Sequence, residues 1–130
     1  MNAVVIGAGL SGLMAARELS KNRNINVRIL STGAGASPYV HGFNIPLAEE
    51  DSVDCFRLDT LKNGYFLNKP QLVDILCEES LKLLSVLEEL GIELDKDGDR
   101  YCLLKPLGST HPRVASSGNH TGALIMKRLR

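Results

Sequence analysis

The sequence predicts an α/β fold that opens with a strand, a helix and a second strand over residues 1–33. An apolar run, Ala3–Ile6, leads directly into a glycine-rich turn, and a second segment of strand type, Ile25–Leu30, follows the helix-prone residues 13–19. Segments of strand type on either side of a helical stretch are typical of two parallel strands joined by one helix. We therefore expect a Rossmann-like βαβ unit at the start of the chain.

The turn itself, Gly7-Ala8-Gly9-Leu10-Ser11-Gly12, has the glycine spacing of a dinucleotide-binding fingerprint. Gly7 permits the tight turn off the strand, Gly9 lets the backbone approach a pyrophosphate, and Gly12 lets the helix pack closely on the strand. Phosphates would lie at the helix N-terminus, where free N–H groups and the helix dipole favour an anion. The expected cofactor contacts here are Gly7, Gly9, Leu10, Ser11 and Gly12.

The second strand ends at Ser31-Thr32-Gly33, without the Asp or Glu that usually binds the ribose of NAD. This absence counts against a nicotinamide-binding module and favours a larger cofactor that is also held elsewhere. Ser31 and Thr32 could hydrogen-bond a ribose or a phosphate, or they could simply cap the loop.

Residues 34–47 show no periodicity and are predicted to form a loop beside the cofactor. Small residues there would let backbone lie against a flat ligand, and Tyr39 or His41 could hydrogen-bond or stack on it. A mobile surface loop is the alternative interpretation.

Residues 48–130 are expected to form a helical and hairpin extension. One helix is predicted from about Ala48 to Asn63, and a second from Pro70 to the stop at Gly91, with a leucine stripe facing the core. Two short strands, 92–94 and 100–104, would flank an Asp/Gly turn as a hairpin.

Composition narrows the classes of partner. The 130 residues suffice for one small domain, and the formal net charge of zero gives no reason to expect nucleic acid or an anionic membrane. The three widely spaced cysteines, Cys55, Cys77 and Cys102, show no metal-ligand spacing, so neither a metal site nor a disulfide is expected. No segment reads as a signal peptide or a membrane span, so a cytoplasmic location is expected.

Taken in order, these pieces resemble the FAD-dependent flavoproteins of the succinate dehydrogenase, fumarate reductase and L-aspartate oxidase family. The matching pieces are the Gly7 to Gly12 turn, Ser37 and Gly42 in the loop, Glu50-Asp51-Ser52, Asp59-Thr60 with Gly64, Leu87 to Ile92, Gly108 to Arg113, and Thr121-Gly122 opening a helix. The resemblance implies that residues 1–130 are the N-terminal portion of an FAD-binding domain, with 34–47 as a flavin-side loop. It adds Ser37, His41 and Gly42 to the expected cofactor contacts.

Within this family the chain is most similar to the L-aspartate oxidases, which oxidise L-aspartate to iminoaspartate for NAD biosynthesis. Members with covalent flavin carry a His at the position of Ala36, so the resemblance implies non-covalent FAD. It implies a small dicarboxylate or amino-acid substrate for the full-length protein, with the catalytic group expected beyond Arg130. The sheet would then be incomplete, and a homo-oligomer is one way to cover its open edge.

Two alternatives stay open: a succinate dehydrogenase or fumarate reductase flavoprotein fragment, and a non-catalytic remnant. The second is favoured by the length of the chain and by two departures from the family pattern. Phe43 replaces the second of two glycines, and Ser109 replaces a histidine.

Overall fold

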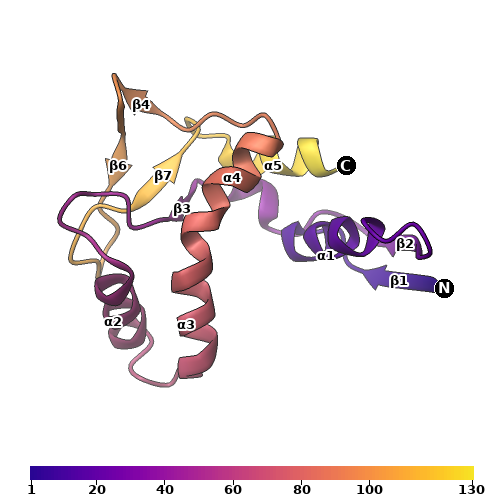
Figure 1. Cartoon of the computed structure of the whole chain (residues 1–130), viewed down its shortest axis with the longest axis horizontal. Coiled ribbons are helices and arrows are strands. Elements are labelled where there is room, and N and C mark those ends of the chain that lie inside the picture. Colours follow the sequence, from indigo (N-terminus) through magenta and orange to yellow (C-terminus); the bar gives the residue numbers. More distant parts are fainter.

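The computed structural model describes all 130 residues, arranged as short strands and helices in the order shown in Figure 1. The elements are β1 (Asn2–Ile6), α1 (Leu10–Ser20), β2 (Asn26–Leu30), the 3-10 helix η1 (Ser37–Tyr39), β3 (Gly42–Asn44), α2 (Val53–Asn63), α3 (Pro70–Glu79), the 3-10 helix η2 (Ser80–Lys82), α4 (Leu83–Glu89), β4 (Lys96–Asp97), β5 (Arg100–Tyr101), β6 (Leu103–Leu104), β7 (Val114–Ser116) and α5 (Thr121–Leu129). The β1–α1–β2 unit and the α2–α3 pair lie at opposite ends of the molecule (Figure 1).

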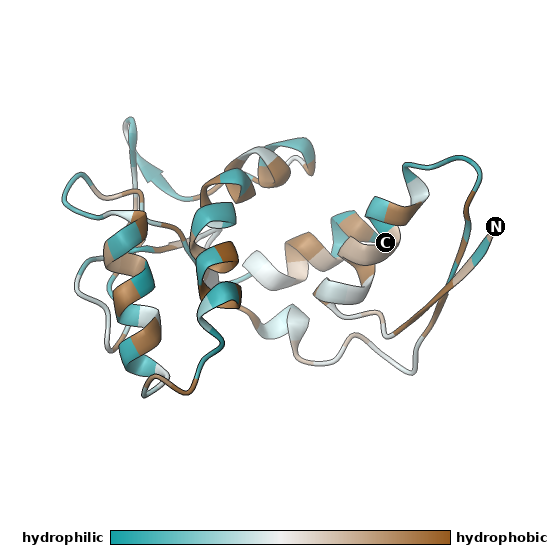
Figure 2. Cartoon of the chain, turned by 60° about the horizontal axis from the view of Figure 1, so that its bottom comes forward, coloured by the Kyte–Doolittle hydropathy of each residue, from teal (hydrophilic) through white to brown (hydrophobic).

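The predicted βαβ unit is confirmed. Strands β1 and β2 pair in parallel, with Asn2 opposite Asn26 and Ile6 opposite Leu30, and α1 packs on one face of the pair. The other face has no cover: Ile6 is 87% exposed and Leu30 58% exposed. Figure 2 shows these hydrophobic strands with no other segment laid over their outer side. The sheet is therefore incomplete, as expected, while its coverage by a second copy stays a prediction.

The predicted loop over residues 34–47 is only partly irregular. It contains η1 and the strand β3, which pairs antiparallel with β7, Gly42 lying opposite Ser116. Strand β7 also pairs with β6, so that three short strands form one sheet in the order β3-β7-β6. The sequence does not predict this sheet, because its strands are two or three residues long and come from distant parts of the chain.

The two predicted helices exist with different bounds. The first begins at Val53 rather than near Ala48, because the Ser52 hydroxyl caps it by accepting the Cys55 N–H at 3.1 Å. The second is interrupted between α3 and α4 by η2. The Ser80 hydroxyl there donates to the Cys77 carbonyl at 2.7 Å, a side-chain bond that competes with regular helical geometry.

The predicted hairpin is present but shorter. Its strands are β4 and β5, whereas residues 92–94 form no strand. Ile92 instead lies in a buried cluster with Leu87 and Ile125, which joins α4 to α5, and a second cluster of Phe56, Val73 and Cys77 joins α2 to α3. None of the helices is long and apolar enough to cross a lipid bilayer.

Candidate functional site

The glycine turn between β1 and α1 has the conformation that its sequence predicts. Gly7 has a φ of +106°, which side chains of L-residues rarely adopt, and its N–H donates to the Leu30 carbonyl of β2 at 2.8 Å. A Cβ on Gly12 would lie 2.0 Å from the carbonyl oxygen of Gly7. Only glycine at position 12 therefore lets α1 approach the turn this closely.

The first turn of α1 presents unpaired donors. The Leu10 N–H is bound by the Ser37 hydroxyl at 2.9 Å, and the Leu13 N–H by the Gly9 carbonyl at 3.0 Å. The N–H groups of Ser11 and Gly12 have no protein partner, and no acidic side chain lies in this turn. Two free N–H groups at the positive end of a helix dipole form a site suited to an anion such as a phosphate.

The space over this turn is open. A Cβ built on Gly7 meets no atom within 4 Å, and the backbone of Gly9 is extended, with φ of −74° and ψ of 177°. The residues present therefore fit the pyrophosphate of a dinucleotide, which needs close backbone approach at this point.

Ser31 and Thr32 lie exposed just after β2, next to the glycine turn. The Ser31 hydroxyl is engaged in its own loop, donating to the Gly33 carbonyl and accepting the Gly33 N–H. This favours the loop-capping interpretation for Ser31. Thr32 makes no side-chain hydrogen bond within the chain, so its hydroxyl is free for a ligand.

Ser37 is held in place by the N-terminus of α5. The buried Thr121 hydroxyl donates to the His41 carbonyl and accepts the Ser117 N–H, while the Gly122 N–H donates to the Val40 carbonyl at 2.8 Å. A Cβ on Gly122 would lie 2.3 Å from the Ser37 carbonyl oxygen. The Thr121-Gly122 pair thus fixes the 37–41 segment, whose Ser37 in turn fixes the start of α1.

The other two predicted loop contacts have different settings. The His41 side chain is exposed and makes no hydrogen bond within the chain. Gly42 lies in β3, where a Cβ would meet the Ala115 carbonyl at 2.4 Å, so strand pairing alone accounts for its missing side chain. The neighbouring Phe43 packs against the cluster of Leu87, Ile92 and Ile125.

A buried ionic network was not foreseen from the sequence. Arg113 is fully buried and binds Asp51 through two hydrogen bonds, from Nε at 2.9 Å and from Nη2 at 2.8 Å. Its Nη2 also lies 3.0 Å from Asp59, which accepts the backbone N–H and the hydroxyl of Thr110. The guanidinium lies over the Phe56 ring, 5.0 Å from its centre. The network joins the start of α2 to the segment that enters β7.

Charge and hydrogen bonding act against burial at Asp59. Burial by itself raises the pKa of this carboxyl, but the two hydrogen bonds from Thr110 and the charge of Arg113 outweigh burial and hold the pKa below its usual range. Asp59 is therefore ionised in the folded chain at neutral pH.

A cavity of about 640 Å³ adjoins this network. Its walls include Gly42, Phe43, Asp59, Ser109 and Arg113. The two positions at which the sequence departs from the family pattern, Phe43 and Ser109, therefore line the same space. The Nη1 atom of Arg113 is buried without a hydrogen-bond partner.

Comparison with known proteins agrees with these features. Residues 2–130 match the FAD binding domain family. An uncharacterized FAD-dependent oxidoreductase of Methanocaldococcus jannaschii is 33% identical, over 97% of this chain and 24% of that protein. One chain of the CoM/CoB fumarate reductase of Methanothermobacter marburgensis is 32% identical, over 98% of this chain and 25% of that one. An L-aspartate oxidase of Caulobacter vibrioides is 32% identical, over 95% of this chain and 25% of that enzyme.

Solved structures give the same result for the fold. The Sdh1 complex of Mycobacterium smegmatis has a chain that matches with a TM-score of 0.87 and 27% identity, over 98% of this chain and 23% of that chain. The E. coli quinol fumarate reductase matches with a TM-score of 0.88 and 22% identity, over the same shares, a likeness of fold alone. This chain spans about a quarter of the length of the curated relatives it matches. The chain belongs to the FAD-binding domain family of the succinate dehydrogenase and fumarate reductase flavoproteins, whose cofactor is FAD.

Proposed function

We propose that this chain is the ADP-binding part of an L-aspartate oxidase that holds FAD without a covalent bond. The observation that carries the proposal is the pair of free N–H groups of Ser11 and Gly12 at the start of α1, under the open space over Gly7. When bound, FAD would supply a two-electron acceptor for hydride leaving the substrate carbon.

The residues of this chain would bind and orient the cofactor. The Ser11 and Gly12 N–H groups would donate to the pyrophosphate, and the free Thr32 hydroxyl would reach a ribose at the end of β2. Ser37 would hold the Leu10 N–H and thereby fix the direction of α1. His41, exposed at the end of the 37–41 segment, would lie on the flavin side of the site.

Three observations support the finer parts of the proposal. Several relatives of this chain are L-aspartate oxidases, including that of Pyrococcus furiosus at 30% identity. Ala36 stands where family members with covalent flavin carry a histidine, which supports non-covalent FAD. The three cysteines are free, which supports a reducing, cytoplasmic location.

Titration of the flavin-free product of the whole gene with FAD, followed by quenching of flavin fluorescence, tests the cofactor site. Gly9→Val should abolish binding, because the new side chain would fill the space needed by the phosphates and would press on the Ser37 hydroxyl, which a Cβ at position 9 approaches to 3.2 Å. Ala15→Val, on the exposed side of the same helix, is the matched control and should bind FAD as the native chain does. Equal affinities for the native chain and Gly9→Val would refute the site.

The substrate is tested on the product of the whole gene. A yellow protein that L-aspartate bleaches and succinate does not, with formation of peroxide, would support the proposal. Bleaching by succinate, or oxidation of the reduced protein by fumarate, would favour a succinate dehydrogenase or fumarate reductase instead. A colourless protein that takes up no FAD would favour a non-catalytic remnant. By itself the 130-residue chain should bind FAD weakly or not at all and oxidise no aspartate, because the isoalloxazine needs walls from more than this unit.

A further inference from the structure

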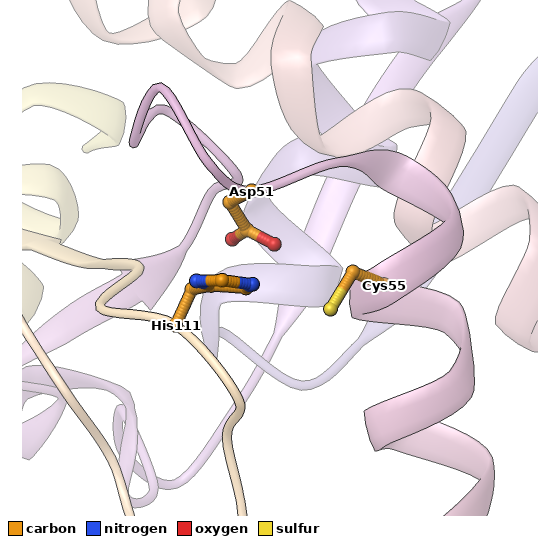
Figure 3. A group of neighbouring side chains, drawn as sticks. All are labelled: Asp51, Cys55 and His111. Atoms are coloured by element: carbon orange, nitrogen blue, oxygen red, sulfur yellow. The ribbon is translucent and has the colours of Figure 1, made fainter.

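Three potential metal ligands converge at one point of the fold, away from the glycine turn. Asp51 precedes α2, Cys55 lies in its first turn, and His111 lies in the segment before β7. Figure 3 shows the three side chains directed toward one another. One ligand atom from each lies within 4.8 Å of the other two. Spacing along the chain does not predict a metal here, because Asp51 and Cys55 lie far from His111 in the sequence.

The cluster is buried at its carboxylate and partly open at its other two ligands. The Asp51 carboxylate is buried against Arg113, whereas Cys55 and His111 are half-buried residues that keep some contact with solvent. A cation would therefore enter past Cys55 and His111 and meet the carboxylate last.

Each of these residues keeps a free lone pair. Asp51 Oδ1 already accepts from Arg113 Nη2 and from the Ser52 N–H, both at 2.8 Å, but Oδ2 accepts only from Arg113 Nε at 2.9 Å. A carboxylate oxygen has two lone pairs, so one on Oδ2 remains available. The His111 ring makes no hydrogen bond within the chain. The Cys55 sulfur has only a long contact, 3.9 Å from Arg113 Nη2.

The charge balance leaves room for a cation despite the neighbouring arginine. Arg113 carries one positive charge, and Asp51 and Asp59 carry two negative charges, so this buried network has a net charge of −1. A divalent cation bound with Cys55 as a thiolate would bring the total to zero. Buried charge is costly unless it is balanced, so the added cation and the lost thiol proton together favour the folded chain.

We propose that Asp51, Cys55 and His111 bind a divalent transition-metal ion of the zinc type. Sulfur, imidazole nitrogen and carboxylate oxygen are the ligands that zinc takes, and three protein ligands would leave a fourth position for water. Tetrahedral zinc, with bonds of about 2.0–2.3 Å, holds its ligand atoms between roughly 3 and 4 Å apart. The most widely separated pair of ligand atoms therefore needs to close by roughly 1–2 Å on binding. Binding transfers the Cys55 thiol proton to solvent and forms the metal–sulfur bond.

The test uses the 130-residue chain without a histidine tag, freed of metal by chelation and titrated with Co²⁺ and Zn²⁺. We expect one equivalent of Co²⁺ to produce a thiolate-to-metal charge-transfer absorption, which Zn²⁺ then abolishes by displacement. About one proton should be released per Zn²⁺ bound at neutral pH. Cys55→Ser should lose the charge-transfer band, and His111→Gln should weaken Zn²⁺ binding at least tenfold.

Matched controls use the same substitutions elsewhere. Cys102→Ser and His120→Gln change exposed residues outside the cluster and should leave the band and the affinity unchanged. Circular dichroism establishes that each variant is folded, and the two ligand variants provide independent evidence if one of them unfolds. The proposal is overturned if the chain shows no saturable binding at one equivalent, or if Cys55→Ser and His111→Gln bind as the controls do. FAD is absent throughout, so the outcome is separate from that of the cofactor titration.

Discussion

Substituting Gly12 by alanine changes the free energy of unfolding in two opposite ways, through helix propensity and through a steric contact. Alanine favours a helix by about 1 kcal/mol over glycine, so Gly12→Ala in α1 would by propensity alone stabilise the chain. The structure predicts the reverse. The new Cβ would lie 2.0 Å from the Gly7 carbonyl oxygen, about 1 Å inside the 3.0 Å limit that real Cβ contacts respect. A backbone oxygen cannot rotate away, so α1 must shift, and overpacking of this kind costs about 1–3 kcal/mol.

Because the contact is with backbone, its cost lies in the upper part of that range, roughly 2–3 kcal/mol, and net of the propensity gain Gly12→Ala should lower the free energy of unfolding by about 1–2 kcal/mol. The shift also moves the Ser11 N–H away from the phosphates, so the affinity for FAD should fall at least tenfold, about 1.4 kcal/mol. Urea denaturation followed by circular dichroism measures the first quantity, and flavin fluorescence the second. Gly33→Ala is the matched control for stability, because a Cβ there meets nothing within 4 Å.

A Gly12→Ala chain that is as stable as the native chain, or more stable, would refute this reasoning, since it would show that propensity outweighs the contact. If Gly12→Ala lowers stability but leaves the FAD affinity unchanged, the contact with Gly7 is supported. The proposal that the N-terminus of α1 binds the FAD phosphates is then refuted. Reduced stability of Gly33→Ala by the same amount would show that an added methyl group destabilises this chain even where it meets no atom, so the contact with Gly7 would not be responsible.

Three other predictions have defined outcomes. Thr121→Val removes the partner of two partly buried backbone groups, the Ser117 N–H and the His41 carbonyl, and should destabilise the chain by about 1–2 kcal/mol in urea denaturation. Thr32→Val, at an exposed threonine, should leave stability within about 0.5 kcal/mol. Because the folded-state pKa of Asp59 lies below its ordinary value of 3.8, the unfolded chain binds more protons between the two values. The free energy of unfolding should thus fall as the pH falls below about 4, and Asp59→Asn should flatten that part of the pH profile. Because Ala36 replaces the attachment histidine, acid precipitation of the whole gene product should leave its flavin in the supernatant, and flavin retained on the precipitated chain would contradict non-covalent binding.

The sequence by itself was sufficient for the βαβ unit and the glycine turn. Both depend on interactions between residues close along the chain: apolar runs that pair as strands, a glycine at a positive φ, and a helix that starts within three residues of it. The start of α5 at Thr121 followed from the family resemblance, and the role of the Thr121 hydroxyl was not predicted. The glycine turn by itself indicates a dinucleotide but does not say which one. The resemblance to the family identified the cofactor as FAD.

Only the tertiary structure brought together residues that lie far apart in the sequence. Asp51 reads as an acid of a helix first turn, yet it lies before α2, which Ser52 caps, and it binds Arg113 instead. Gly42 reads as a flavin contact, yet its pairing with β7 explains the missing side chain. Local propensity determines which segments become helix or strand. The way the chain packs these segments together determines which charged residues, distant in the sequence, come into contact. That packing depends on contacts spread over the whole chain, which no single stretch of sequence contains.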